Sequence, residues 1–109
     1  MSEDVCEVVI TAPDAEWLAD FTRRLVDDRL AAAGHVTAET RSIYRWEGQV
    51  YDKPEARLVL HTRRSLVSEL VARTNAEHPY VVPCVAATPI VDGGPEYVAW
   101  ILAETKRPD

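Results

Sequence analysis

The stretch His78-Pro79-Tyr80-Val81-Val82-Pro83 decides where the second half of the fold changes direction. Proline cannot continue a helix, and the residue before a proline is pushed out of the α region. A helix must therefore stop at His78, whose backbone is then extended. Pro83 stiffens the chain ahead of an apolar run that begins at Cys84. The stretch predicts a helix before it, a rigid connection, and a strand after it.

The residues on either side of this stretch fit that prediction. A helix is expected from Ser65 to about Glu77, with an inward face formed by Leu66, Val67, Leu70 and Val71. A strand is expected from roughly Cys84 to Val91. Gly93-Gly94 then interrupts the chain, and Pro95 suits the first turn of a last helix. The apolar stripe of that helix consists of Tyr97, Trp100 and Ile101.

The beginning of the chain predicts a strand and a long helix. The short apolar run from Val5 to Thr11 has the character of a central buried strand. Asp14 is a suitable N-cap for the helix that follows, which we expect to run to about Ala33. Gly34 is the expected C-terminal cap residue of this helix.

The middle of the chain predicts a long hairpin. Tyr44 and Trp46 alternate with Arg45, and Glu47-Gly48 supplies a turn. The return strand runs through Val50 and Tyr51 and resumes from Ala56 to Thr62. Pro54 cannot donate to a ladder, so it marks a bulge or an edge.

The length of this hairpin predicts an oligomer. An arm of about twelve residues is roughly 40 Å long, whereas the second helix covers only about 20 Å. Part of the hairpin must overhang the core, and it carries Tyr44, Trp46 and Tyr51. An exposed strand of this kind is prone to aggregate unless a partner subunit covers it. We therefore expect a homo-oligomer.

These elements define one α+β domain over residues 1–109. Their order is βαββαβ followed by a C-terminal helix, which is the ferredoxin-like arrangement of an antiparallel sheet covered on one face by two helices.

Composition excludes several classes of protein. The chain has 109 residues, of which 47 % are hydrophobic and 28 % charged, a balance that suits a single globular core. Its net charge of −6 argues against nucleic acid as a partner. No apolar run approaches the ~18 residues that span a bilayer. The acidic start Met1-Ser2-Glu3-Asp4 lacks the basic region of a signal peptide, which favours a cytoplasmic protein. Cys6 and Cys84 sit in apolar runs and are expected to be buried, inert thiols, with a disulfide or a metal pair as the less favoured alternative.

Two histidines are candidate functional residues, each with an alternative role. His78, beside Glu77, is a candidate ligand for copper or zinc, or a turn histidine bonded to backbone. His61 lies at the end of a strand. It is either a cleft residue that meets Glu55 or Cys84, or a partly solvated strand end. The sequence has no Cys-x-x-Cys or His-x-x-x-His spacing that would strengthen a metal site.

The aromatic residues also have two possible roles. They either line a pocket for a flat ligand or anchor a subunit interface, and the interface is the preferred interpretation, since each ring buries a large area and keeps a polar group. The residues are Tyr44, Trp46, Tyr97 and Trp100.

In this order and spacing, the segments resemble the CutA family, the divalent-cation-tolerance proteins, over nearly the whole chain. The matching segments are Thr11-Ala12-Pro13-Asp14, Leu30-Ala31-Ala32, Tyr44-Arg45-Trp46-Glu47-Gly48, Glu55, Leu60-His61-Thr62, His78-Pro79-Tyr80, Pro83, Pro89 and Tyr97-Val98-Ala99-Trp100-Ile101. The resemblance implies a cytoplasmic homotrimer, similar in architecture to the PII signalling proteins, with clefts between subunits. It also implies a role in tolerance to copper and other divalent metals, with no firmly attached enzymatic activity.

Three positions depart from the usual family pattern. Ala33 replaces a cysteine, His61 replaces a lysine, and Cys84 replaces a residue that is often acidic. The missing thiol at position 33 would have been a natural soft ligand for copper. These departures weaken the case for the common family route to metal binding.

The leading hypothesis is a trimeric, non-enzymatic protein that binds a divalent metal such as copper, or a small ligand, in clefts between subunits. The expected metal ligand is His78, and the expected cleft residues are Trp46, Glu55, His61, Tyr80 and Trp100. The alternative is a PII-like regulator that acts through a protein partner. A third hypothesis is an enzyme of the dimeric α+β barrel kind, which a dimer mass would support.

Overall fold

A computed structural model describes residues 3–108 of the chain. Four strands and three helices follow one another in the order β1, α1, β2, β3, α2, β4, α3, with a single 3-10 turn between β3 and α2. Their bounds are β1 Val5–Ala12, α1 Ala15–Asp27, β2 Ala33–Trp46, β3 Gln49–Arg63, α2 Val67–Glu77, β4 Val85–Pro89 and α3 Pro95–Glu104. The predicted order of elements is confirmed.

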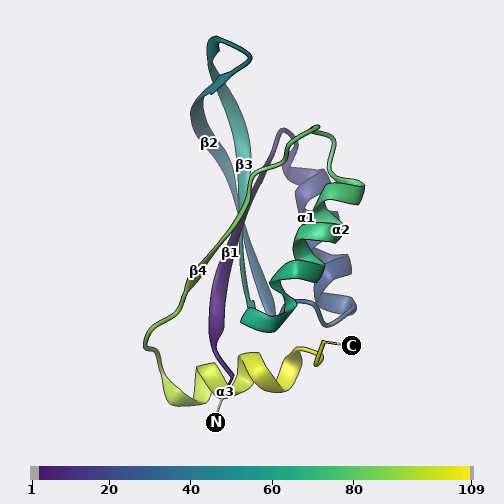
Figure 1. Cartoon of the computed structure of the whole chain (residues 1–109), viewed down its shortest axis with the longest axis vertical. Helices are drawn as coiled ribbons and strands as arrows, with labels where there is room; N and C mark the ends of the chain where they lie inside the picture. The colour runs from purple at the N-terminus through teal and green to yellow at the C-terminus, as the bar shows by residue number, and fades with distance from the viewer. Residues whose placement is uncertain (1–2, 109) are drawn as a thin grey trace.

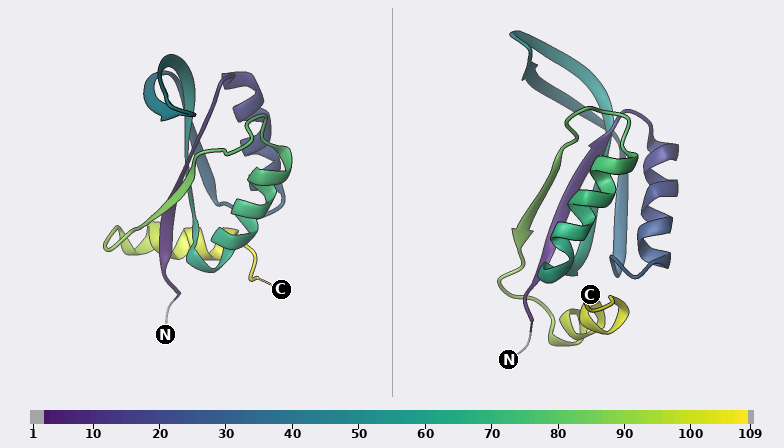
Figure 2. Two further views of the ribbon diagram at one scale, coloured as in Figure 1. Left: turned by 45° about the horizontal axis from the view of Figure 1, so that its top comes forward. Right: turned by 45° about the vertical axis from the view of Figure 1, so that its right-hand side comes forward.

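The strands form one antiparallel sheet in the order β2-β3-β1-β4. Helices α1 and α2 lie side by side on one face of it, and α3 crosses its end near the N-terminus (Figures 1 and 2). This is the predicted ferredoxin-like α+β fold with an additional C-terminal helix. None of the helices within residues 3–108 is long and apolar enough to cross a membrane.

The core lies between the sheet and the two covering helices. Because successive side chains of a strand point to opposite faces, every second residue of β1 and of the β3 segment that starts at Ala56 reaches this core. The helices contribute an apolar face to it, as their spacing predicts. The largest side chains that are fully buried there include Val8, Ile10, Leu18, Phe21, Leu25, Leu58, Leu60, Leu66 and Leu70.

Helix α1 begins as predicted but ends earlier. The Asp14 carboxylate accepts a hydrogen bond from the Glu16 backbone N–H at 3.0 Å, which confirms the N-cap. The predicted end at Ala33 is wrong, because the helix stops at Asp27 and Arg29 turns the chain with φ of 61°. The expected cap residue Gly34 lies instead in β2. A Cβ atom there would lie 2.3 Å from Thr22 Cγ2, so glycine is required where α1 approaches the sheet.

Strands β2 and β3 form the predicted overhanging hairpin. They are joined by the two-residue turn at Glu47 and Gly48, with φ of 49° and 80°. Strand β1 pairs with Ala56–Arg63, the covered half of β3, and leaves Gln49–Glu55, the overhanging half, with β2 as its only partner. The hairpin projects beyond the helices (Figure 1), and the molecule measures 46 × 25 × 23 Å.

Pro54 lies in the overhanging half, opposite Arg41, where β3 is an edge strand. One of its two predicted roles, an edge, is therefore confirmed. The bulge lies across the ladder in β2, where the register shifts between Ala38 and Thr40. A proline is tolerated here because the side of β3 that β1 would occupy is open.

The stretch after α2 behaves as its prolines require. Helix α2 ends at Glu77, and His78 has an extended backbone with φ of −71° and ψ of 143°. The next strand is shorter than predicted. It was expected from Cys84 to Val91, but β4 spans only Val85–Pro89. Its pairing with β1 stops at Ile10, and the carbonyl of the next β1 residue, Thr11, binds the His78 side chain instead.

Candidate functional site

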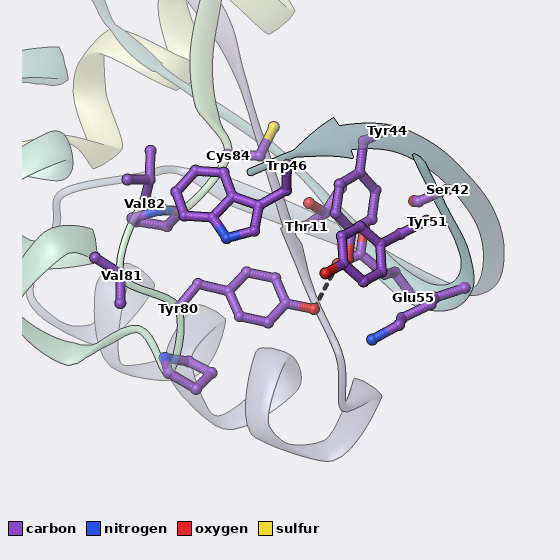
Figure 3. Close-up of a pocket in the computed structure, with 13 residues that line it drawn as sticks. Thr11, Ser42, Tyr44, Trp46, Tyr51, Glu55, Tyr80, Val81, Val82 and Cys84 are labelled. Carbon is purple, nitrogen blue, oxygen red and sulfur yellow. Dashed lines mark hydrogen bonds between the residues drawn. The ribbon is translucent and has the colours of Figure 1, made fainter. Parts of the chain in front are cut away.

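The hairpin and the connection after α2 enclose a pocket of about 690 Å³, called here the hairpin pocket (Figure 3). Strands β2 and β3 form one wall and the loop before β4 forms the other. The lining residues are Thr11, Ser42, Tyr44, Trp46, Tyr51, Lys53, Glu55, Pro79, Tyr80, Val81, Val82, Pro83 and Cys84.

The hairpin wall follows from strand alternation. Ser42, Tyr44 and Trp46 are alternate residues of β2, and Tyr51, Lys53 and Glu55 are alternate residues of β3, so each set shares one face. Tyr44 lies directly opposite Tyr51 in the ladder, and their rings stack with centroids 5.4 Å apart. The Lys53 ammonium lies 4.9 Å from the centroid of the Tyr51 ring. The wall is therefore aromatic, with charged groups beside the rings.

Tyr80 connects the two walls. Its hydroxyl donates a 2.8 Å hydrogen bond to the carboxylate of Glu55 (Figure 3), a residue only 7 % exposed. Burial, together with this bond and the charge of Glu55, raises the pKa of Tyr80 well above its ordinary value. The Tyr80 hydroxyl therefore remains a hydrogen-bond donor throughout the physiological pH range.

His78 positions this tyrosine. Its Nε2–H donates to the Thr11 carbonyl at 2.7 Å, and its Nδ1 accepts from the Tyr80 backbone N–H at 3.0 Å. The ring is buried and meets Trp17 edge-on, with centroids 5.2 Å apart. Both ring nitrogens are thus hydrogen-bonded to backbone groups. This is the second role considered for His78, a turn histidine bonded to backbone.

This geometry leaves His78 without a lone pair for a metal ion, which argues against its predicted role as a ligand. Among residues 3–108, no group of three or more His, Cys, Asp or Glu side chains is arranged to hold a metal. The residues of a single chain therefore do not fit the copper or zinc site that the sequence suggested.

The five expected cleft residues separate into two groups. Trp46, Glu55 and Tyr80 meet in the hairpin pocket. The other two, His61 and Trp100, lie outside it. His61 is in the covered half of β3, roughly 20 Å along the strand from Glu55 at ~3.3 Å per residue. Within one chain, His61 therefore does not meet Glu55 or Cys84, and a meeting across two subunits stays a prediction.

His61 instead belongs to a hydrogen-bonded trio that connects the sheet to α3. Its Nε2 binds the Glu7 carboxylate at 2.7 Å, and its Nδ1 binds the Tyr97 hydroxyl at 2.5 Å. Trp100 stacks on Tyr97 with ring centroids 5.6 Å apart. Both aromatic residues belong to α3, so they lie near the opposite end of the molecule from the hairpin pocket (Figure 1).

The two thiols differ from one another, contrary to expectation. Cys6 is buried in the core, and burial raises the pKa of its thiol. Cys84, predicted to be buried, is exposed at the edge of the hairpin pocket. The cause is the short β4, which begins one residue later and leaves Cys84 in the loop.

Sequence analysis missed several pocket residues, among them Thr11, Ser42, Lys53, Val81 and Val82. The signal for two of them was present. Once Trp46 and Glu55 are candidates, alternation along their strands adds Ser42 and Lys53. The loop residues gave no such signal, because their position depends on how the chain crosses from α2 to β4.

A family model described as CutA1 divalent ion tolerance protein matches residues 6–104. This chain belongs to that family. It is 38 % identical over 98 residues to the divalent-cation tolerance protein CutA of Thermus thermophilus, covering 90 % of this chain and 95 % of that protein. It is 34 % identical over 100 residues to the CutA of Pyrococcus horikoshii, covering 92 % and 97 % of the two chains. It spans 55 % of the chloroplastic CutA of Arabidopsis thaliana.

Solved structures of the CutA1 family have the same fold. The crystal structure of CutA1 from Oryza sativa matches with a TM-score of 0.94 at 31 % identity, covering 98 % of each chain. A structure from Archaeoglobus fulgidus, described as a periplasmic divalent cation tolerance protein, matches with a TM-score of 0.89 at 29 % identity, covering 94 % of this chain and 99 % of that one. The cytoplasmic location expected for this CutA-family member therefore stays a prediction.

Proposed function

We propose that this CutA-family protein is a non-enzymatic homotrimer that binds a small ligand in the hairpin pocket. The observation that carries the proposal is the pocket itself, in which four aromatic rings and a buried carboxylate lie between the overhanging hairpin and the loop before β4. Concave, mostly apolar sites with a few convergent polar groups are where proteins bind small molecules.

The exposed parts of the hairpin support the oligomer. Ile43 and Val50 are 65 % and 62 % exposed, and Trp46 is 42 % exposed. Strands β2 and β4 are the two open edges of the sheet, so unpaired backbone groups are available on both. A neighbouring subunit that covers the hairpin would remove this apolar surface from water and close the hairpin pocket on its open side.

The relatives are named for tolerance to divalent cations, but the hairpin pocket of one chain has few groups that could bind such a cation. The hairpin pocket offers one carboxylate, that of Glu55, and one exposed thiol, that of Cys84. Stable protein sites for copper or zinc need three or four converging ligands. A cation site built from the described residues would therefore need donors from more than one subunit.

Two measurements test the proposal. Native mass spectrometry of the full chain should give the mass of a trimer. A panel of small molecules should include compounds that raise the melting temperature. Those compounds should lose their effect in Trp46→Ala and keep it in Trp100→Ala. The second variant is a matched control because both tryptophans are 42 % exposed and only Trp46 lines the pocket. A monomeric or dimeric mass, or equal loss in both variants, would contradict the proposal.

A second candidate is a PII-like regulator that binds a protein partner. It is favoured by the outer face of the hairpin, where Ile43 and Val50 project away from the hairpin pocket on an arm that extends beyond the core. If these residues remain exposed in the trimer, as hydrogen–deuterium exchange of the hairpin would show, a protein partner becomes the better explanation for them.

A further inference from the structure

Glu55 is a buried acid without a cation. The residue is 7 % exposed, and its carboxylate accepts a hydrogen bond from the Tyr80 hydroxyl at 2.8 Å. It makes no ion pair with any of residues 3–108, whereas the half-buried acids Glu3 and Glu77 each face an arginine and Glu69 faces Lys106. Burying a carboxylate is costly unless a positive group and hydrogen bonds compensate it. The hairpin pocket therefore has a site for positive charge beside Glu55.

The rings around Glu55 are suited to the same kind of charge. Trp46, Tyr51 and Tyr80 line the pocket with Glu55, and Figure 3 shows the Tyr80 ring extending from the loop toward the hairpin rings. The face of an aromatic ring carries negative charge and attracts cations, especially organic ones that are weakly hydrated. The chain already shows this attraction, since the Lys53 ammonium lies 4.9 Å from the centre of Tyr51.

Lys53 does not satisfy the carboxylate. It is on the same strand face as Glu55 but forms no ion pair with it within the described chain. Its ammonium marks the wall of the pocket where a cation is favoured, and Glu55 lies two residues further toward the core. The space between the hairpin and the loop, about 690 Å³, accepts a small molecule.

We propose that the hairpin pocket binds an organic cation of the ammonium class, with Glu55 as the counter-ion and the rings of Trp46, Tyr51 and Tyr80 as an aromatic cage. This rests on the proposed function, that the pocket takes a small ligand, and adds the chemical class of that ligand. The cation has two possible sources, a free amine or the side chain of a lysine from a second copy of the chain. Both use the same carboxylate and the same rings.

The test compares cations with neutral molecules of the same shape. Choline is titrated against 3,3-dimethylbutan-1-ol, and benzylammonium against benzyl alcohol, by isothermal calorimetry on the full chain. Each cation should bind at least tenfold more tightly than its neutral counterpart. Glu55→Gln keeps an oxygen that accepts a hydrogen bond from Tyr80. It should lower the affinity for the cations at least tenfold and leave the affinity for the neutral molecules unchanged.

Two further variants complete the design. Glu47→Gln removes the same charge from the exposed hairpin turn and should leave all four affinities unchanged. Trp46→Leu alters an exposed hairpin position that the core does not use, so it folds even if Glu55→Gln does not. Trp46→Leu should lower the affinity for the cations at least threefold.

The outcomes separate the inference from the function on which it rests. If each neutral molecule binds as tightly as its cation, the ammonium class is wrong and the small-ligand pocket stands. If nothing binds and Glu55→Gln raises the subunit dissociation constant at least tenfold relative to Glu47→Gln, the cation is a lysine of the second copy, so the cation site stands and the small-ligand function is wrong. If nothing binds and assembly is unchanged, both the inference and the small-ligand function are overturned.

Discussion

The two halves of β3 belong to one continuous strand but have different surroundings. The covered half, Ala56–Arg63, lies between β1 and β2 and sends Leu58 and Leu60 into the core. The overhanging half, Gln49–Glu55, pairs within the described residues only with β2 and carries the pocket residues Tyr51, Lys53 and Glu55. The same alternation of side chains thus serves folding in one half and a candidate binding site in the other.

This difference shows how the fold separates its tasks. Residues of the covered half are fixed by the close packing of a core, where one methylene group changes stability. Residues of the overhanging half face solvent or a pocket, and in the proposed trimer a neighbouring subunit, so their identity is not set by the fold of one chain. The comparison predicts that substitutions in the covered half destabilise the subunit, and that those in the overhanging half change assembly and binding.

The largest effect should come from Leu58→Ala, set against Val50→Ala. Leu58 is fully buried, so truncation leaves a cavity and should lower the free energy of unfolding by about 2–5 kcal/mol. Val50 is 62 % exposed, and its truncation should cost less than about 0.5 kcal/mol in the dissociated subunit. Urea denaturation at low protein concentration measures both.

The same pair should behave differently in sedimentation experiments. Val50→Ala should shift the trimer toward smaller species at a concentration where the wild type is assembled, because it removes apolar surface from the overhanging half. Equal losses of stability from the two substitutions in dissociated subunits would show that the hairpin folds as part of the core, and the comparison would fail.

Local signals in the sequence predicted most of the fold. Asp14 as an N-cap, Glu47-Gly48 as a turn and Pro79 as a helix stop each act through their own backbone or side chain, and the structure confirms them. The predicted end of α1 was wrong because Leu30, Ala31 and Ala32 continue the apolar pattern of a helix. Contacts distant in sequence override it, since the Leu30 carbonyl accepts from the Thr62 hydroxyl and the Ala32 N–H donates to the His61 carbonyl.

The candidate site was only partly predictable for a similar reason. Trp46, Glu55 and Tyr80 meet because a loop crosses from α2 to the root of the hairpin, and the sequence identified the residues but not that path. A meeting of His61 and Glu55 within one subunit could have been excluded beforehand, since two residues six positions apart on one strand cannot meet. The role of His78 depended on Thr11, far away in the sequence, whose carbonyl its ring binds.

The next largest effect should come from His78, which links the covered core to the pocket wall. His78→Ala leaves the Thr11 carbonyl without its hydrogen bond and should lower the free energy of unfolding by about 1–3 kcal/mol. Its affinity for copper(II) and zinc, titrated against a competing chelator, should equal that of the wild type. His35→Ala is the control, since His35 is exposed on β2. A selective loss of tight metal binding in His78→Ala would restore the metal-ligand hypothesis.

The smallest effect compares two acids that face arginines, Glu77 among the helices and Asp52 on the overhanging half of β3. Burial raises the pKa of Glu77, but hydrogen bonds and charges from Arg73 and Arg24 outweigh it, so the net pKa lies below the ordinary value. The pKa of Asp52 is lowered by its bond to Arg41 on the open hairpin. The two acids therefore share a direction of shift but differ in their surroundings.

A lowered pKa in the folded state means that the unfolded chain binds protons first as the pH falls. The stability contributed by Glu77 should be complete above the unfolded pKa of about 4.3 and be lost as the pH falls through the folded value. Glu77→Gln should thus cost up to about 1 kcal/mol at pH 7 and nothing near pH 2, in urea denaturation at low salt. Asp52→Asn should leave the unfolding midpoint unchanged at every pH, because water and ions screen its solvent-exposed pair with Arg41. An equal, pH-dependent loss in both variants would mean that a neighbouring subunit buries the Arg41–Asp52 pair, and the overhanging half would then contribute to stability only in the assembled protein.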